Sequence, residues 1–113
     1  MLSRDQILQA ADNGATAVDV PEWGGSVYVR IMSGRERDAF EAQMIASKDR
    51  SMENFRAKMA AVCVCDDQGK RIFSDQDVEA LGAKSSTALQ RIFDAALRIN
   101  RMAPGDVEEL RKN

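Results

Sequence analysis

The stretch VCVCDDQGKRIFSDQDVEALGAKSSTALQRIFDAALRIN, residues 62–100, decides the fold of this chain. It runs from an apolar segment through a tight turn and a short extended segment into two helices. Ser74 caps the first helix, and acidic residues follow in its first turn, where the helix dipole favours them. Gly82 ends that helix, and Ser85 or Ser86 caps the second. The block therefore predicts a helical scaffold with well-marked starts and stops.

The second of these helices carries a nearly complete apolar stripe. Its members recur at the i, i+3, i+4, i+7 and i+8 spacing that lines one face of a helix. They are Leu89, Ile92, Phe93, Ala96 and Leu97. We expect this face to form a large part of the hydrophobic core.

Another apolar stripe precedes the turn, with a spacing typical of a helix. It comprises Met52, Phe55, Met59 and Val62, and Cys63 extends it. Residues 64 and 65 either finish this helix or begin an extended segment. Gly69 can supply a positive φ in a turn over residues 66–70. Because residues 71–73 are short and extended in character, a small hairpin over 63–73 is a further prediction.

The N-terminal part predicts a short helix followed by a β-hairpin. Ser3 and Gln6 form a capping-box pattern for a helix over residues 3–11, whose narrow apolar face is Ile7 and Leu8. Residues 16–32 predict a β-hairpin with a loop longer than two residues. Since a lone hairpin is marginally stable in water, it must pack on helices or pair with another chain.

A second capping box, formed by Ser33 and Glu36, predicts a helix that runs to about residue 47 with Phe40 and Met44 facing inward. A loop is expected at 48–50, and Pro104 suits the start of a short terminal helix over 104–112. The sequence thus predicts one domain over residues 1–113. Its fold class is α+β and mostly helical, with an N-terminal helix and a β-hairpin packed with four or five helices.

The hairpin holds three partner-binding candidates, Trp23, Tyr28 and Met32. A tryptophan in a polar turn either folds over the core as a lid or anchors a partner. Tyr28 and Met32 alternate with Val27 and Val29 along the second strand. If the valine face packs on the helices, the opposite face is partly exposed and can bind.

Composition and charge exclude several classes of function. The net charge is −2, the pI is near 5.1, and lysines and arginines form no cluster, so nothing indicates a nucleic-acid partner. No apolar run approaches the roughly 18 residues of a membrane-spanning helix, and the N-terminus lacks a signal-peptide pattern. We therefore expect neither nucleic acid nor membrane as a partner, and a cytoplasmic location.

The sequence also lacks the residue patterns that catalysis or metal binding requires. The chain has no histidine, which removes Ser-His and Cys-His nucleophile pairs and the usual zinc ligand sets. Cys63 and Cys65 have a C-x-C spacing rather than the C-x-x-C of a redox or zinc site, so we expect two buried side chains. Acidic residues crowd residues 66–79, but the registers that start at Asp66 and Asp75 both fail the calcium-loop pattern. The sequence predicts no catalytic, cofactor or metal site.

Five segments, each a generic turn or amphipathic helix, follow one another in a characteristic order. They are VDVPEWGGSVYVR (18–30), SGRERDAFE (33–41), DDQGKRIFS (66–74), DVEALG (77–82) and LQRIFDAALRIN (89–100). In this order and spacing the chain resembles the tail assembly chaperones of long-tailed (siphovirus-type) bacteriophages, over most of its length. The resemblance brings no catalytic residues and no cofactor.

The resemblance implies a non-enzymatic protein that acts in the host cell cytoplasm and is absent from the mature virion. It implies binding to the tape measure protein, which is kept soluble until tail tube protein polymerises around it. The tail tube protein is a further candidate partner, and self-association is expected because several copies would line one long client. Six methionines suit an adaptable contact surface.

Two other interpretations stay open. One is a small dimeric regulatory or adaptor domain that pairs through the hairpin, but the basic recognition helix expected of such a DNA-associated module is missing from the sequence. The other is a minor structural tail protein, which mass spectrometry of purified particles would detect.

Overall fold

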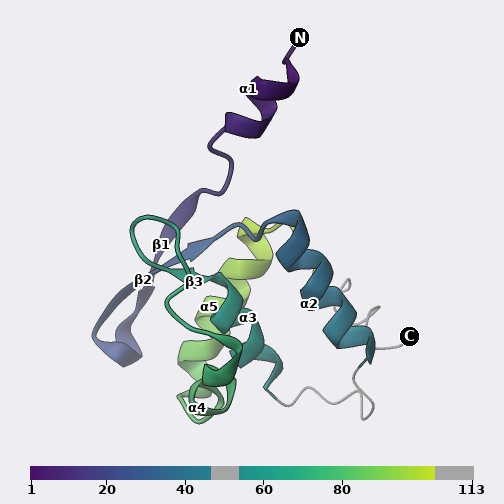
Figure 1. The fold of residues 1–113 in the computed structure, drawn as a ribbon. Coiled ribbons are helices and arrows are strands. Elements are labelled where there is room, and N and C mark those ends of the chain that lie inside the picture. Colours follow the sequence, from purple (N-terminus) through teal and green to yellow (C-terminus); the bar gives the residue numbers. More distant parts are fainter. Residues whose placement is uncertain (47–53, 104–113) are drawn as a thin grey trace.

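The computed structural model describes residues 1–46 and 54–103, and within them it shows a mostly helical α+β fold, as predicted (Figure 1). Among these residues are two short 3₁₀ helices: η1 forms the loop of the hairpin, and η2 leads directly into α4. The elements in chain order are α1 (Arg4–Gln9), β1 (Ala15–Val20), η1 (Pro21–Trp23), β2 (Gly25–Arg30), α2 (Gly34–Ala46), α3 (Phe55–Cys63), β3 (Val64–Cys65), η2 (Asp75–Asp77), α4 (Val78–Gly82) and α5 (Ser86–Ile99).

The sheet is antiparallel, with the strand order β1-β2-β3. The predicted hairpin is confirmed: β1 pairs with β2 from Ala15 opposite Arg30 to Val20 opposite Gly25, and η1 forms its long loop. Residues 64 and 65 are extended and pair with β2. The second, smaller hairpin also forms, because the Asp66 N–H donates to the Lys70 carbonyl and Gly69 adopts a φ of 81°.

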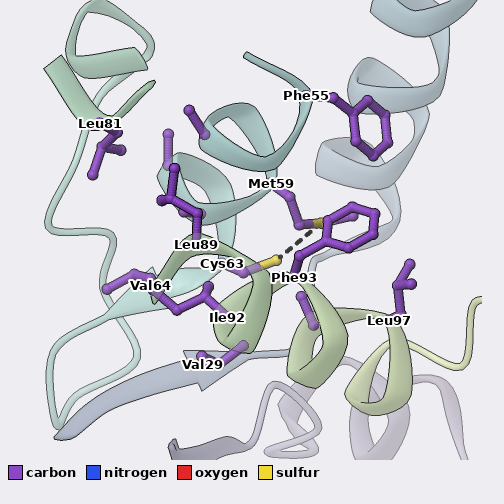
Figure 2. Close-up of a cluster of buried hydrophobic side chains, with 14 of the residues drawn as sticks. Val29, Phe55, Met59, Cys63, Val64, Leu81, Leu89, Ile92, Phe93 and Leu97 are labelled. Atoms are coloured by element: carbon purple, nitrogen blue, oxygen red, sulfur yellow. Dashed lines mark hydrogen bonds between the residues drawn. The ribbon is translucent and has the colours of Figure 1, made fainter. Parts of the chain in front are cut away.

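Helix α5 packs against β1 and β2, α3 packs against α5, and together they form the centre of the core (Figure 2). The predicted stripe of α5 is buried throughout, and Phe55 of α3 contacts Phe40 and Phe93, with ring centroids 5.6 and 5.2 Å away. Both cysteines are buried free thiols, as predicted, and burial raises the pKa of Cys63 to about 12. The thiols therefore pack as apolar groups.

A buried polar junction joins the end of β2 to three helices. The Arg30 guanidinium is almost fully buried and donates to the Val62 carbonyl and to both carboxylate oxygens of Glu36. The hydrogen bonds from Arg30 hold the pKa of Glu36 at about 2. Asn100, at the end of α5, accepts the Met32 N–H at 2.7 Å and donates to the Arg30 carbonyl at 3.3 Å. This junction fixes where the hairpin meets the helices.

The sequence predicts a partly exposed side chain for Met32, and the structure corrects this prediction. Only 5% of its surface is exposed, and it belongs to the core. The strand ends at Arg30, so the two-residue alternation that placed Met32 beside Tyr28 does not extend to it.

The position of α1 also differs from the expectation. Its capping box forms as predicted, with the Gln6 N–H 3.2 Å from the Ser3 hydroxyl, but the helix ends at Gln9 and no residue of it is buried. Figure 1 shows it standing clear of the other helices. The N-terminal helix is therefore not packed with the rest of the domain. Met52, the 48–50 loop and the helix predicted over 104–112 lie outside the described residues.

Candidate functional site

A mostly apolar groove of about 280 Å³ opens beside the tip of the β-hairpin. We call it the Trp23–Phe73 groove. It is lined by Trp23, Phe73, Asp77, Ala80, Leu81 and Lys84, which come from η1, the segment after the small hairpin, η2 and α4 with its C-terminal flank. An apolar hollow with a few charged groups at its edge is the usual form of a site for an apolar side chain or ligand.

The Trp23 wall of the groove is held by the hairpin loop. Pro21 begins η1, and Gly24 closes the loop with a φ of 75°, which glycine adopts without strain. Glu22 then pairs with Arg91 of α5 at 2.9 Å, and this hydrogen bond lowers the pKa of Glu22 and raises that of Arg91. The loop that carries Trp23 is thus connected to α5.

Trp23 combines the two roles left open by the sequence. It is half-buried and packs against the core, as a lid would, and it also lines the groove. Its indole Nε1 is buried without a hydrogen-bond acceptor among the described residues. Because an unpaired buried donor is unfavourable, the packing of the ring against the core must outweigh that cost.

The opposite wall comes from the capped start of the η2–α4 segment. The Ser74 N–H donates to the Asp77 carboxylate at 2.8 Å, and the Ser74 hydroxyl accepts the Gln76 N–H at 3.3 Å. This cap turns the chain so that Phe73, just before it, and Leu81, in α4, line the same groove. Asp77 and Lys84 also line the groove and carry opposite charges. Such a surface matches the apolar stripe and mixed-charge flanks of an amphipathic helix.

A larger and more polar hollow of about 550 Å³ lies at the start of α5. Its two arginines already have partners: Arg56 donates to Gln90 and lies over the Phe93 ring, while Arg91 pairs with Glu22. Residues 1–46 and 54–103 contain no group of three or more side chains placed to hold a metal ion, and no helix among them is long and apolar enough to cross a membrane. The apolar groove is therefore the candidate site.

Residues 3–113 match the family model described as phage tail assembly chaperone. The chain belongs to this family. The chaperone is also similar to the solved structure of the tail assembly chaperone of bacteriophage HK97, with 24% identity and a TM-score of 0.62 over 88% of this chain and 94% of that one. No curated protein sequence matches it. At this identity the structural likeness shows a shared fold.

Family membership places the chaperone in phage tail assembly, implies protein partners there, and implies a non-enzymatic role. The fold does not bring the three predicted partner-binding residues together. Trp23 lines the groove, Tyr28 is 41% exposed on β2 outside it, and Met32 is buried beyond the other end of that strand.

Sequence reasoning missed Phe73 and Leu81 as lining residues. The sequence predicts for Phe73 only a place in the short extended segment 71–73. The available signal was an aromatic residue directly before a capped helix, which marks a position where the chain turns. That signal does not reveal that Trp23, 50 positions earlier, faces the same groove.

Proposed function

We propose that this chaperone binds the tape measure protein and keeps it soluble during tail assembly in the host cytoplasm. It would do so without catalysis or a cofactor, and would be absent from the mature virion. The observation that carries the proposal is the Trp23–Phe73 groove, an apolar site edged by one acidic and one basic residue in a member of the tail assembly chaperone family.

The physical task is to cover apolar stripes on a long helical client. Such stripes associate with one another when they are left exposed in water. The groove has room for a few apolar side chains, while Asp77 and Lys84 can pair with charges flanking the client's stripe. One groove per chaperone gives a contact of modest strength. Several copies would therefore bind along one client and be released as tail tube protein polymerises around it.

Trp23 is the proposed anchor for the client, because large aromatic side chains in desolvated sites dominate binding energies. Tyr28 is a second proposed contact on the outer face of β2, where it is exposed. Met32 is not carried into this proposal as a contact, since reaching it would require opening the core.

Co-expression with a phage tape measure protein tests the proposal. We expect the client to remain in the supernatant with the wild-type chaperone. Ala80→Arg should return the client to the pellet, because Ala80 is exposed and lines the groove, so the longer side chain obstructs the site without entering the core. The matched control is Ile45→Arg, at another exposed helical position.

The proposal fails if the client is equally insoluble with and without the chaperone. Preserved circular dichroism and melting temperature would show that Ala80→Arg folds normally. Mass spectrometry of purified particles provides the second check: the chaperone should be missing from them, whereas a minor structural tail protein would be present.

A further inference from the structure

The N-terminal arm, residues 1–13, carries apolar side chains that its own chain leaves uncovered. Leu2, Ile7 and Leu8 are 71%, 55% and 67% exposed, and none of the residues of α1 is buried. The local sequence nevertheless specifies a helix, because Ser3 and Gln6 complete a capping box and Leu2 and Ile7 occupy the two positions of a hydrophobic staple. A six-residue helix is marginal by itself in water, so these signals favour a helix that packs on another surface.

We propose that α1 of one copy packs into the Trp23–Phe73 groove of a second copy, so that copies join head to tail. The inference rests on the proposed function in one respect, namely that the groove accepts amphipathic helices. It adds the identity of a self-association surface and of the segment that fills it.

The charges of the two surfaces are complementary. On α1, Arg4 lies three and four residues before Ile7 and Leu8, so it borders their apolar face, and Asp5 lies beside it. The groove presents Asp77 and Lys84. Arg4 can therefore meet the acidic residue and Asp5 the basic one.

Arg4 and Asp5 of the arm and Lys84 of the groove are free to exchange partners, while one carboxylate oxygen of Asp77 already accepts the Ser74 N–H. Arg4 and Asp5 pair with each other at 3.0 Å, but their side chains are 82% and 77% exposed, and such a pair contributes little. Within the described part of the chain, Lys84 makes no ion pair. Docking would thus replace one weak solvent-exposed pair with two pairs next to an apolar contact.

The arm and the groove lie at opposite ends of the hairpin. The arm leaves β1 at Ala15, whereas Trp23 follows Val20 at the other end of a strand that spans ~20 Å (Figure 1). One contact between two copies therefore leaves a free groove on one copy and a free arm on the other. Such a contact is heterologous, and further copies can add to it.

The experiment is sedimentation velocity of the purified full chain without client, over low to high micromolar concentration. We expect the weight-average sedimentation coefficient of the wild type to rise with concentration. The arm variant Ile7→Asp/Leu8→Asp and the groove variant Ala80→Arg should each associate at least ~10-fold more weakly. Both change exposed positions, so their melting temperatures should remain near that of the wild type. Ile45→Asp is the matched control and should associate normally.

Mixing the two variants gives the decisive result. The arm variant keeps a groove and the groove variant keeps an arm, so the mixture should form a heterodimer that does not grow further. A wild type that stays monomeric at every concentration would overturn the proposal. A monomer is also what docking of the arm into the groove of the same copy would give, so that arrangement would overturn it too. An arm variant that associates like the wild type, or a mixture that forms no dimer, would also overturn it.

A charge exchange tests the predicted pairing. Asp5→Lys and Lys84→Glu should each weaken association, and the double variant should restore it. A double variant weaker than both single variants would contradict the pairing. Because no client is present in these experiments, their failure leaves the client-solubility test standing, and failure of client binding leaves the sedimentation result standing.

Discussion

Helices α1 and α5 start in the same way and end up in opposite environments. In each, a serine hydroxyl accepts a backbone N–H three residues on, at 3.2 Å from Ser3 to Gln6 and at 3.2 Å from Ser85 to Ala88. Seven residues of α5 are buried, and none of α1 is. A cap therefore fixes where a helix begins, while its burial depends on what the rest of the chain places beside it.

The two helices differ in how they are connected to the sheet. The end of α5 is fixed to β2 through Asn100, which bonds to the backbone at Arg30 and Met32. The segment before β1 has one such tie, from the Ile31 N–H to the Gly14 carbonyl at 3.2 Å. One helix is thus part of the scaffold, and the other is available to a second molecule.

The largest effect should come from truncating a buried residue of α5. Ile92 has 0% exposure, so Ile92→Ala should lower the free energy of unfolding by ~2–5 kcal/mol through lost burial and a cavity. The same type of truncation in α1, Leu8→Ala, should change it by less than ~0.5 kcal/mol. Urea unfolding of both variants at low protein concentration measures the contrast. Equal losses would show that α1 packs on its own domain.

Helix α2 extends the comparison, because Glu36 of its capping box also pairs with the buried guanidinium of Arg30. Glu36 contributes stability that is fully present above pH 4.5, its ordinary pKa, and is lost as the pH falls toward about 2. Glu36→Gln should therefore cost about 3 kcal/mol near neutral pH, and the difference from wild type should shrink across that window. Unfolding free energies measured from pH 2 to 7 test this. A difference that is independent of pH would contradict the role of the Arg30 pair.

A smaller loss should follow from removing the amide that anchors the end of α5. Asn100→Ala leaves the Met32 N–H and the Arg30 carbonyl without their side-chain partner in a buried site. We expect a loss of about 2 kcal/mol, since an unsatisfied buried polar group costs about 1–3 kcal/mol. Denaturant unfolding gives the value, and hydrogen exchange at Met32 should accelerate. A loss below ~0.5 kcal/mol would mean that water replaces the amide.

The smallest effects compare the two caps directly. Ser85→Ala should cost about 1 kcal/mol of global stability, the typical value of a helix cap. Ser3→Ala should leave global stability unchanged and reduce only the helicity of the arm, which amide exchange at residues 4–9 reports. A measurable loss of melting temperature for Ser3→Ala at low concentration would show that α1, like α5, contributes to the stability of its own domain.

Local signals explain what the sequence predicted well. Helix caps at Ser3, Ser33, Ser74 and Ser85 depend on residues within one turn, and the α5 stripe depends on a spacing within one helix. Met32 was misplaced because the alternation of a strand was extended past its last paired residue. The exposure of α1 could not be read from Ile7 and Leu8, because two adjacent apolar residues look the same whether or not another element covers them.

The candidate site was predicted less completely than the fold. Trp23 was identified from its unusual position in a polar turn, and it does line the groove. Phe73 and Leu81 were not, since the groove exists only where the hairpin loop meets the start of α4. The hairpin loop itself is tied to α5 by the Glu22–Arg91 ion pair, whose members lie 69 residues apart, so no local signal reveals its position.

The placement of the single tryptophan has an optical consequence. An indole emits at longer wavelength when water can relax around it and at shorter wavelength when it is enclosed. Trp23 forms a wall of the groove, so any occupant that covers the half-exposed ring should shift its emission to the blue. The protein therefore carries an intrinsic reporter of groove occupancy, readable without a label and titratable with any tryptophan-free peptide.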